Sequence, residues 1–546
     1  MSDIAWWQEG VIYQIYPLSF ADSNGDGRGD LRGIISRLEY LNDGTPASLG
    51  VDAIWLSPVY PSPLRDCGYD VSDYTDIAPA MGTLADFDEL VDGAHARGIR
   101  VILDLVLNHT SDQHPWFIAS RSSRDNSRRD WYLWHDGGGP RRPPNNWRSR
   151  FGGRAWTWDA ATRQWYMHGF LPEQPDVNWR NPQVKAAMWE VVRFWLDRGV
   201  DGFRLDVVNH YIKDDQWRDN PARWWYRESP LRSLVAYDRQ WHIYDRDRPE
   251  LKDVLREFRQ LLDAYPERMS VGEVSSDDPL GVAAALCGPE LLHLTFNFAF
   301  THSPWRAAAF QEAIRRWEAA LGPGSWPTYT LSNHDVPRHY SRYGRRDAAR
   351  RARVAAAMLL TLRGTPFLYY GEEIGMRETA IPRRELVDPV GKRYWPFYRG
   401  RDGCRTPMQW DATAHAGFST ARPWLRVNDD YTRRNVAAQR DDPNSLLSFY
   451  RQLIWLRKAT PALRRGSYEP FQESARDSLA FLRRTAEQTV LVVLNFADRP
   501  TRLVPDRPWP SRRWRVLLST AGRNGEELPG LAPVFAPYEV CIMEAL

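Results

Sequence analysis

The chain has 546 residues, a formal net charge of +3 at pH 7, 43% hydrophobic residues and 26% charged residues. These values are typical of a globular protein with two or three domains and argue against a nucleic-acid partner, since the arginines are scattered among acidic residues. The four cysteines lie far apart in the sequence and form no CxxC pair, so neither a zinc site nor a disulfide framework is indicated.

The first ten residues lack a basic region followed by an apolar run, and no apolar stretch is long enough to cross a membrane. We therefore expect no export signal, no membrane partner and a cytoplasmic location. We make no prediction of the oligomeric state.

Short apolar runs alternate with longer amphipathic ones along most of the chain. The predicted strands are 11–17, 51–58, 100–109, 202–208, 269–274, 291–298, 328–335 and 365–372. The predicted helices between them include 84–97, 181–198, 250–265, 305–320 and 347–362. Eight nearly continuous apolar strands with interposed helices predict a closed parallel (β/α)8 barrel, an α/β fold. An open doubly wound sheet is the alternative, but the Gly-rich turn expected after its first strand is missing.

Three regions break this alternation. Residues 110–180 are rich in Trp, Arg, Gly and Pro and too long for an ordinary loop, so they predict a small domain inserted after the third strand. Residues 467–546 carry short apolar or alternating runs, which predict a C-terminal antiparallel β domain. The barrel then comprises 1–109 and 181–466, with a long excursion at about 375–444.

Polar side chains follow four of the predicted strands. The third strand ends in DLVLNH at 104–109, the fourth carries Arg204 and Asp206, the fifth ends at Glu273 and the seventh ends in SNHD at 332–335. Because the chemistry of such barrels sits at the carboxyl ends of their strands, these residues are expected to meet in one site. Each taken alone could instead be a loop cap or a structural ion pair.

Arg204 and Asp206 lie two positions apart, so both side chains leave the strand on the same face. A cation beside a carboxylate lowers its pKa and keeps it ionised, as a carboxylate nucleophile requires. The alternative for this stretch alone is an ion pair that only stabilises the core.

Converging carboxylates without a strong metal-ligand cluster indicate acid–base and nucleophilic chemistry on an acetal, such as glycoside cleavage. Glu273 is the expected acid, because nearby aspartates would raise its pKa. Asp206 is the expected nucleophile, and Asp335 a third carboxylate that binds and distorts the sugar. His109 and His334 are expected to donate hydrogen bonds to sugar hydroxyls.

At this point the chain resembles the α-amylase superfamily of retaining glycosidases (family 13), and within it the α-glucosidase and oligo-1,6-glucosidase branch. The matching motifs are GVIYQIYP at 10–17, DLVLNH at 104–109, QPDVN at 174–178, GFRLD at 202–206, GE at 272–273, SNHD at 332–335 and RTPMQW at 405–410. The resemblance implies a TIM barrel with an inserted domain and a C-terminal β-sandwich. It also implies that Asp206 is the nucleophile, Glu273 the acid/base and Asp335 the transition-state stabiliser.

The resemblance further implies a pocket for the terminal glucose, held by Asp66 and Tyr69. Arg405 is expected to pair with Asp66 and close this pocket, with Arg401 the less favoured candidate for that pairing. The remaining expected sugar-contacting residues are Phe151 and Phe170 of the inserted domain, together with His109, Arg204 and His334. A closed pocket implies release of glucose from the non-reducing end of short substrates.

The loop at 22–30 places oxygen donors at alternate positions, with Gly27 at the turn. It is not an EF-hand, because position twelve, which needs an acidic residue, is Gly33. The resemblance implies one structural Ca²⁺ or Mg²⁺, with the ligands Asp22, Asn24, Asp26, the Arg28 carbonyl and Asp30. A polar turn without metal is the alternative.

The leading hypothesis is a hydrolase of short α-glucosides, with no organic cofactor. A transglucosylase, sucrose isomerase or trehalose-forming enzyme on the same scaffold is the second hypothesis. A non-catalytic binding or chaperone subunit is the third, and the intact carboxylates argue against it. Val207, directly after Asp206, resembles the residue found in the branch that accepts α-1,6 bonds, and 211–248 is expected to shape the acceptor side.

Overall fold

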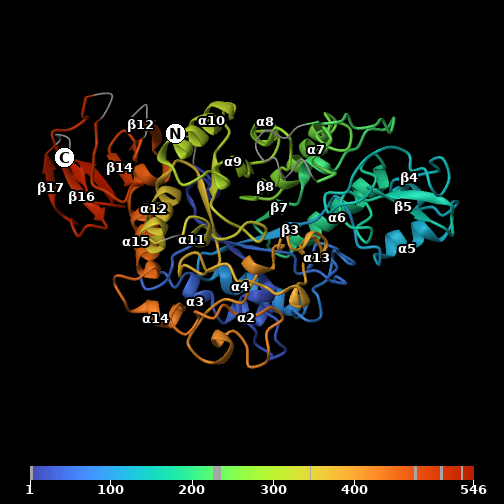
Figure 1. Cartoon of the computed structure of the whole chain (residues 1–546), viewed down its shortest axis with the longest axis horizontal. Coiled ribbons are helices and arrows are strands. Elements are labelled where there is room, and N and C mark those ends of the chain that lie inside the picture. The colour runs from blue at the N-terminus through green and yellow to red at the C-terminus, as the bar shows by residue number, and fades with distance from the viewer. Residues whose placement is uncertain (1–3, 225–234, 345, 472–475, 505–507, 530–532) are drawn as a thin grey trace.

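The computed structural model of the chain describes residues 4–224, 235–344, 346–471, 476–504, 508–529 and 533–546 (Figure 1). An eight-stranded parallel sheet forms the centre, with the strand order β10-β11-β1-β2-β3-β7-β8-β9. Its strands are β1 (Ile12–Ile15), β2 (Ala53–Leu56), β3 (Arg100–Leu105), β7 (Gly202–Leu205), β8 (Met269–Gly272), β9 (Leu294–Thr295), β10 (Thr328–Thr330) and β11 (Thr365–Tyr369). All eight predicted strands are confirmed, although each is shorter than predicted at its carboxyl end.

The sheet is a nearly closed TIM barrel. The described residues show no backbone pairing between β9 and β10, and side chains bridge that gap instead. The Thr328 hydroxyl donates to the Thr295 carbonyl at 2.5 Å, and the Thr301 hydroxyl donates to the Thr330 carbonyl at 2.9 Å.

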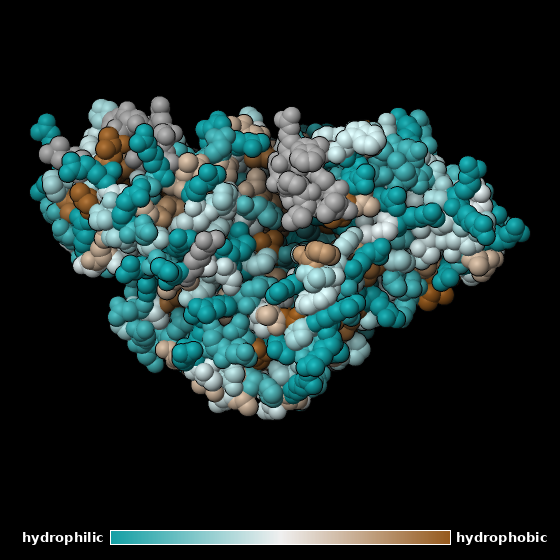
Figure 2. Space-filling model, viewed as in Figure 1, coloured by the Kyte–Doolittle hydropathy of each residue, from teal (hydrophilic) through white to brown (hydrophobic). Residues whose placement is uncertain are grey.

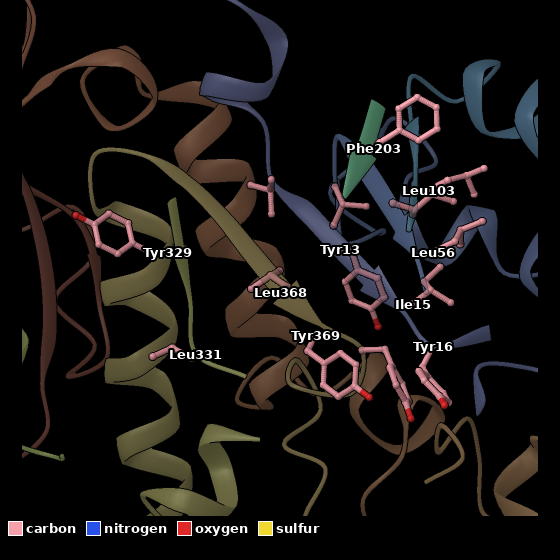
Figure 3. Close-up of a cluster of buried hydrophobic side chains, with 14 of the residues drawn as sticks. Tyr13, Ile15, Tyr16, Leu56, Leu103, Phe203, Tyr329, Leu331, Leu368 and Tyr369 are labelled. Carbon is pink, nitrogen blue, oxygen red and sulfur yellow. The ribbon is translucent and has the colours of Figure 1, made fainter. Parts of the chain in front are cut away.

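Alternate residues of each strand face opposite sides of the barrel wall, as the two-residue period requires. Tyr13, Ile15, Leu56, Leu103 and Phe203 belong to the large core between the strands and the helices (Figure 3). A separate apolar cluster, which includes Ile12, Trp55, Ile102, Val271 and Phe367, comes from the alternating strand positions and fills the barrel interior. Both faces are therefore buried, which explains why the strands read as continuous apolar runs.

The helices of the barrel cover its outside. The larger ones are α4 (Leu84–His95), α6 (Pro182–Asp197), α7 (Leu251–Asp263), α10 (Ala307–Ala320), α12 (Ala348–Thr361) and α15 (Leu446–Ala459). Thr83 and Asp86 form a capping box at the start of α4, and Asn181 caps α6 just before Pro182. No described helix is long and apolar enough to cross a membrane.

Residues 110–180 hold α5 (Pro115–Ser122) and a three-stranded sheet of β4 (Trp134–His135), β6 (Gln164–Met167) and β5 (Trp156–Asp159). From β12 (Ser467–Pro470) onward the chain forms an antiparallel domain, drawn in red at one end of the molecule in Figure 1. Its six-stranded sheet contains β13 (Ser478–Arg484), β14 (Thr489–Asn495), β19 (Val540–Ala545), β16 (Arg513–Ser519) and β17 (Glu527–Pro529) next to β12, and a second sheet pairs β15 (Thr501–Arg502) with β18 (Val534–Phe535).

The segment between β11 and α15 has only short helices, among them α13 (Pro389–Tyr394) and α14 (Val436–Arg440). The face of the molecule in Figure 2 is mostly hydrophilic, with hydrophobic residues scattered rather than gathered. Scattered exposure of this kind is ordinary for a protein surface and needs no functional explanation.

Candidate active site

The three predicted catalytic carboxylates all lie at the carboxyl ends of barrel strands. Asp206 directly follows β7 and Glu273 directly follows β8. Their backbone N–H groups extend the parallel ladder, since Asp206 donates to the Leu105 carbonyl at 3.1 Å and Glu273 donates to the Leu205 carbonyl at 2.9 Å. The strand ladder therefore fixes both backbones, which is the rigid support that a catalytic geometry needs.

Arg204 holds the carboxylates together. It lies in register with Asp104 on the neighbouring strand β3, so both side chains leave the barrel wall at the same level. One terminal nitrogen of Arg204 donates to Asp104 at 2.7 Å and to Asp206 at 2.8 Å, and the other donates to Glu273. Arg204 is 1% exposed, so one buried guanidinium ties carboxylates from three adjacent strands.

The charge balance of this cluster corrects one prediction. Burial, and repulsion from Glu273 and Asp104, raise the pKa of Asp206 above its ordinary range, and the attraction of Arg204 does not fully offset them. Arg204 lowers this pKa as predicted, but the prediction left out burial, which is the largest effect, and the neighbouring carboxylates, and together these raise the pKa overall. Burial likewise raises the pKa of Asp104 to about 6 against the opposing effect of Arg204.

Val207 has a left-handed backbone, with φ of 34° and ψ of 47°. This region is unfavourable for a β-branched residue, so the turn is a point of local strain directly after Asp206. The turn ends β7 and directs the chain into a 3-10 helix at Val208–His210. The Val207 N–H also points at Glu273, at 3.4 Å.

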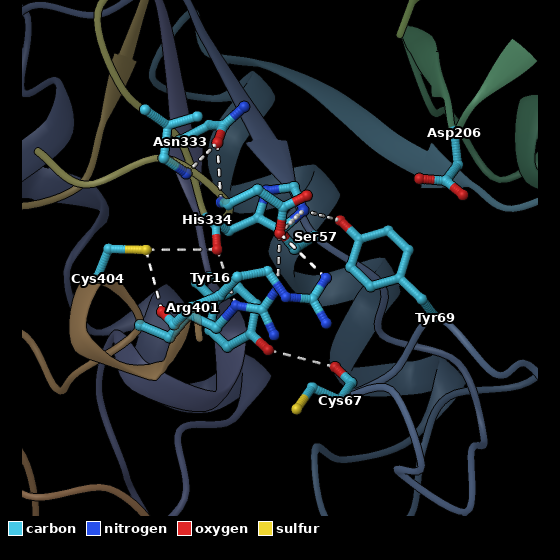
Figure 4. A network of polar contacts seen from close by, with 12 residues as sticks. Tyr16, Ser57, Cys67, Tyr69, Asp206, Asn333, His334, Arg401 and Cys404 are labelled. Atoms are coloured by element: carbon cyan, nitrogen blue, oxygen red, sulfur yellow. Dashed lines mark hydrogen bonds and ion pairs between the residues drawn. The ribbon is translucent and has the colours of Figure 1, made fainter. Parts of the chain in front are cut away.

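A hydrogen-bonded chain supports the cluster from the side of β1. The Gln14 amide donates to Nδ1 of His334 at 2.8 Å, so Nε2 of His334 carries the proton and lies 2.7 Å from the Tyr69 hydroxyl. Tyr69 in turn donates to Asp104 at 2.9 Å. Figure 4 shows the His334–Tyr69 contact, with Tyr69 between His334 and Asp206 in this view. Burial lowers the pKa of His334 to about 3, which keeps the ring neutral as this chain requires.

Asp335 is held by the excursion that follows β11. Arg405 donates to its carboxylate at 2.7 Å, and Arg401 donates to the same oxygen at 3.3 Å. Burial disfavours the charge, but these two guanidinium groups hold the pKa of Asp335 well below its usual range. Asp335 is therefore ionised at neutral pH.

The predicted partner of Asp66 was wrong. Arg401, and not Arg405, pairs with Asp66, at 2.6 Å, and Arg401 also donates to Asp388 at 2.7 Å. Arg405 cannot do the same, because its Nε donates to the His334 carbonyl at 2.8 Å and turns the guanidinium towards Asp335. Burial raises the pKa of Asp66 to about 6, although Arg401 opposes the shift.

The inserted segment brings two aromatic rings to the same region. Phe151 and Phe170 pack edge to face with 5.3 Å between ring centroids, and the Arg401 guanidinium lies over Phe151 at 5.1 Å. Phe170 also contacts the rings of His109 and His210. The structure thus gathers both predicted aromatics around the Arg401–Asp66 pair.

His109 is buried and already bonded within the protein. Its Nε2 lies 3.0 Å from the Tyr69 carbonyl, and its Nδ1 lies 3.1 Å from the Asn108 amide. Burial lowers the pKa of His109 to about 4, so the ring is neutral. Contact of His109 with a sugar stays a prediction.

Two functional residues were missed by the sequence reasoning. Gln14 sits on β1 as the one strongly polar side chain of an apolar strand, and that interruption could have identified it. Asp388 binds Arg401 and caps α13, but nothing in the sequence distinguishes it from an ordinary helix cap.

The loop at 22–30 is held by its own hydrogen bonds. Asp22 accepts from the N–H groups of Gly25 and Gly27 at 2.7 and 2.8 Å, and Asp26 accepts from Arg28 N–H at 2.8 Å. Asp30 accepts from Ser23 and Gly33.

The oxygen donors of this loop are the ligand types that Ca²⁺ and Mg²⁺ prefer, and a hydrogen-bonded carboxylate oxygen keeps a second lone pair. Within the described parts of the chain, however, no group of three or more His, Cys, Asp or Glu is gathered as a metal site. The divalent ion therefore stays a prediction.

A family model described as "Alpha amylase, catalytic domain" matches residues 14–466. The chain is 47% identical to a probable alpha-glucosidase of Rhizobium meliloti (strain 1021), over 98% of this chain and 97% of that protein. It is 39% identical to an oligo-1,6-glucosidase of Parageobacillus thermoglucosidasius, over 92% of each. Among solved structures, the alpha-glucosyl transfer enzyme XgtA superimposes with a TM-score of 0.91 at 41% identity, over the full length of both chains. The trehalulose synthase MutB of Pseudomonas mesoacidophila MX-45 does so with a TM-score of 0.87 at 35% identity, over 99% of each chain.

Proposed function

The chain belongs to the α-amylase family of glycoside hydrolases, and from this premise we propose that it is an exo-acting retaining α-glucosidase. It would hydrolyse terminal, non-reducing α-linked glucose from short oligosaccharides of the maltose or isomaltose type. The relatives named alpha-glucosidase and oligo-1,6-glucosidase support this activity.

The observation that carries the proposal is the shared guanidinium of Arg204. Its two terminal nitrogens hold one oxygen of Asp206 and one of Glu273. A single guanidinium can reach both only when they lie close together. Retaining glycosidases have carboxylates about 5–5.5 Å apart, whereas inverting enzymes need about 6.5–9.5 Å to fit a water.

In the proposed reaction the Asp206 carboxylate attacks the anomeric carbon while Glu273 donates a proton to the leaving oxygen. The glycosidic C–O bond breaks and a covalent glucosyl ester forms on Asp206. Glu273, now a carboxylate, takes a proton from water, which attacks the same carbon and releases α-glucose and free Asp206. Asp335, ionised beside Arg401 and Arg405, would stabilise the positive charge that develops on the sugar ring.

The exo-specificity would come from the ion pair of Asp66 and Arg401. This pair joins the loop after β2 to the excursion after β11, next to Phe151. A sugar pocket closed on this side admits only the terminal sugar of an oligosaccharide.

The test is the stereochemistry of the first product, followed by proton NMR on isomaltose or maltose. We expect α-glucose before mutarotation. Initial β-glucose would contradict the retaining assignment. In the Glu273→Gln variant, kcat/KM should fall more for sugar leaving groups than for activated aryl leaving groups, and equal losses would contradict its acid role.

A glucosyl transferase or isomerase is the second candidate. It rests on the similarity to the alpha-glucosyl transfer enzyme XgtA and to the trehalulose synthase MutB. Hydrolysis and glucosyl transfer share the chemistry up to the covalent intermediate and differ only in the acceptor, which is water in hydrolysis and a sugar in transfer.

We also propose one structural Ca²⁺ or Mg²⁺ in the loop at 22–30, held by Asp22, Asn24, Asp26, the Arg28 carbonyl and Asp30. The donor chemistry of these residues supports it. The cytoplasmic location stays a prediction from the sequence.

A further inference from the structure

One cavity shares no lining residue with the carboxylate cluster and carries an excess of positive charge. It has a volume of about 490 Å³ and lies between the segment after β11 and the helices α12 and α15. Its charged lining consists of four arginines and two aspartates, Arg353, Arg377, Arg433, Arg434, Asp430 and Asp442. The wall therefore has two more formal positive charges than negative ones.

The arginines are only partly neutralised. Arg434 pairs with Asp430 at 2.8 Å, and Arg377 reaches the same oxygen only at 3.8 Å. Arg433 is exposed and makes no ion pair within the described residues. The Asp430 carboxylate is thus shared by the guanidinium groups of Arg434 and Arg377, while Arg433 has no carboxylate partner within the described residues.

Two of the arginines are held in place by an aromatic ring. Arg434 and Arg377 lie over Tyr340 at 4.5 and 5.8 Å from the ring centroid. Stacking of this kind orients a guanidinium without using its N–H groups. In Arg434, Nε already donates to Asp430 at 2.8 Å and one terminal nitrogen to the Ile374 carbonyl at 3.5 Å, so the other terminal nitrogen is the one available to a ligand. Planar guanidinium groups with available edges are the usual partners of phosphate oxygens.

Two long helices also begin at the cavity. Ala349 lies in the first turn of α12, and Ser445 and Leu446 form the start of α15. Helix α12 packs against both α15 and α11 (His339–Arg342), and Figure 1 shows the three together. The partial positive charge at both helix starts adds to the field of the arginines.

From this arrangement we propose that the cavity is a binding site for a small phosphate monoester, separate from the proposed sugar pocket. The two excess positive charges match the two negative charges of a phosphate dianion. A ligand with a single carboxylate would neutralise only one of them. The volume exceeds the needs of the phosphate group alone, so it also accommodates an organic part of the size of a sugar.

The test is isothermal calorimetry on the full chain with glucose 6-phosphate, glucose and inorganic phosphate, without any glycoside substrate. We expect glucose 6-phosphate to bind with a Kd below about 1 mM, more tightly than inorganic phosphate. The double variant Arg377→Ala/Arg433→Ala should weaken binding at least tenfold. Both side chains are exposed, so the fold should persist.

Arg316→Ala, on the exposed face of α10, is the matched control and should bind like the wild type. Arg433→Lys, which keeps the positive charge, should bind glucose 6-phosphate more tightly than the double alanine variant does. The proposal is overturned if glucose 6-phosphate does not bind, if the double variant binds it as tightly as the wild type, or if inorganic phosphate binds equally well. Because no hydrolysis is measured, these results are independent of the proposed glucosidase activity.

Discussion

Arg204 provides one positive charge for the three carboxylates of Asp104, Asp206 and Glu273. With all three ionised, the buried group would be doubly negative. Burial is the largest cause that raises the pKa values of Asp206 and Asp104, and the excess negative charge of the neighbouring carboxylates adds to it. Arg204 thus positions the three carboxylates, and its lowering of the pKa values of Asp206 and Asp104 is outweighed by the other effects.

Asp206→Asn should abolish turnover and leave the fold intact. The amide keeps the shape of the side chain but cannot attack the anomeric carbon. We expect kcat to fall by about 10³-fold or more, with little change in melting temperature. Asp263→Asn, which affects only a surface pair with Arg259 on α7, is the matched control. Activity within tenfold of the wild type would refute the nucleophile assignment.

The pH profile of the enzyme should reflect the crowded carboxylates. Because the pKa of Asp206 is raised, kcat/KM should fall on the acid side at a pH above about 4, the ordinary value for aspartate. Asp104→Asn removes one negative charge that repels the Asp206 carboxylate. It also leaves Arg204 with one carboxylate fewer to neutralise, so its attraction for Asp206 is stronger. Both effects lower the pKa of Asp206, so the acid limb of kcat/KM should move to lower pH. A limb that stays in place or moves to higher pH would contradict this account.

At the scale of elements, the excursion after β11 is fixed to the barrel by buried ion pairs. Arg401 contacts Asp66, Asp388 and Asp335, which come from three separate segments. Removal of the cation leaves buried carboxylates without a partner, which costs about 3–5 kcal/mol. The excursion should therefore depend on Arg401 for its stability.

A double-mutant cycle can separate the roles of Arg401 and Arg405. Arg401→Ala and Asp66→Asn should be non-additive in the free energy of unfolding, with a coupling of about 0.5–3 kcal/mol, because the two side chains are in contact. Arg405→Ala and Asp66→Asn should be more nearly additive. Urea denaturation of the six proteins measures both couplings. A larger coupling for Arg405 would restore the pairing first predicted from the sequence.

The choice between Arg401 and Arg405 illustrates why such contacts escape sequence reasoning. The two arginines are four residues apart around a short 3-10 helix at Asp402–Cys404. Their directions depend on the His334 carbonyl and on Asp388, which are distant in the sequence. The residue types could be predicted, but their pairing depends on tertiary contacts.

The loop at 22–30 provides a second prediction at this scale. If it binds a divalent ion, chelation should lower the melting temperature by about 2–5 °C and change the turnover of the folded enzyme less than twofold. Asp26→Asn is the informative variant, because the Asp26 carboxylate has only the Arg28 N–H as a hydrogen-bond partner in the described structure. Chelator should affect this variant less than the wild type. An unchanged wild-type melting temperature would argue against a structural metal.

For the whole molecule, strand and helix order could be predicted because each barrel strand is buried on both faces. By contrast, the sequence of β1 does not show which side chains face the barrel interior and which face the helices, because Ile12 and Tyr13 lie on opposite faces but are both apolar. The opening between β9 and β10 could not be predicted either. It depends on the short lengths of these strands and on the Thr328 hydroxyl of β10, which donates to the Thr295 carbonyl of β9 across the gap.

The balance between hydrolysis and transfer is a property of the whole active site, because the covalent intermediate on Asp206 can react with water or with a sugar. The product spectrum from maltose, isomaltose, sucrose and trehalose should therefore decide between the two candidate functions. We expect free glucose as the main product from maltose or isomaltose, measured by chromatography at low conversion, where transfer to accumulated product is small. The Asp206→Asn variant, assayed in parallel, controls for contaminating glucosidase. Glucose as a minor product beside a new disaccharide would replace the hydrolase by a transferase or isomerase, while leaving the roles of Asp206, Glu273 and Asp335 unchanged.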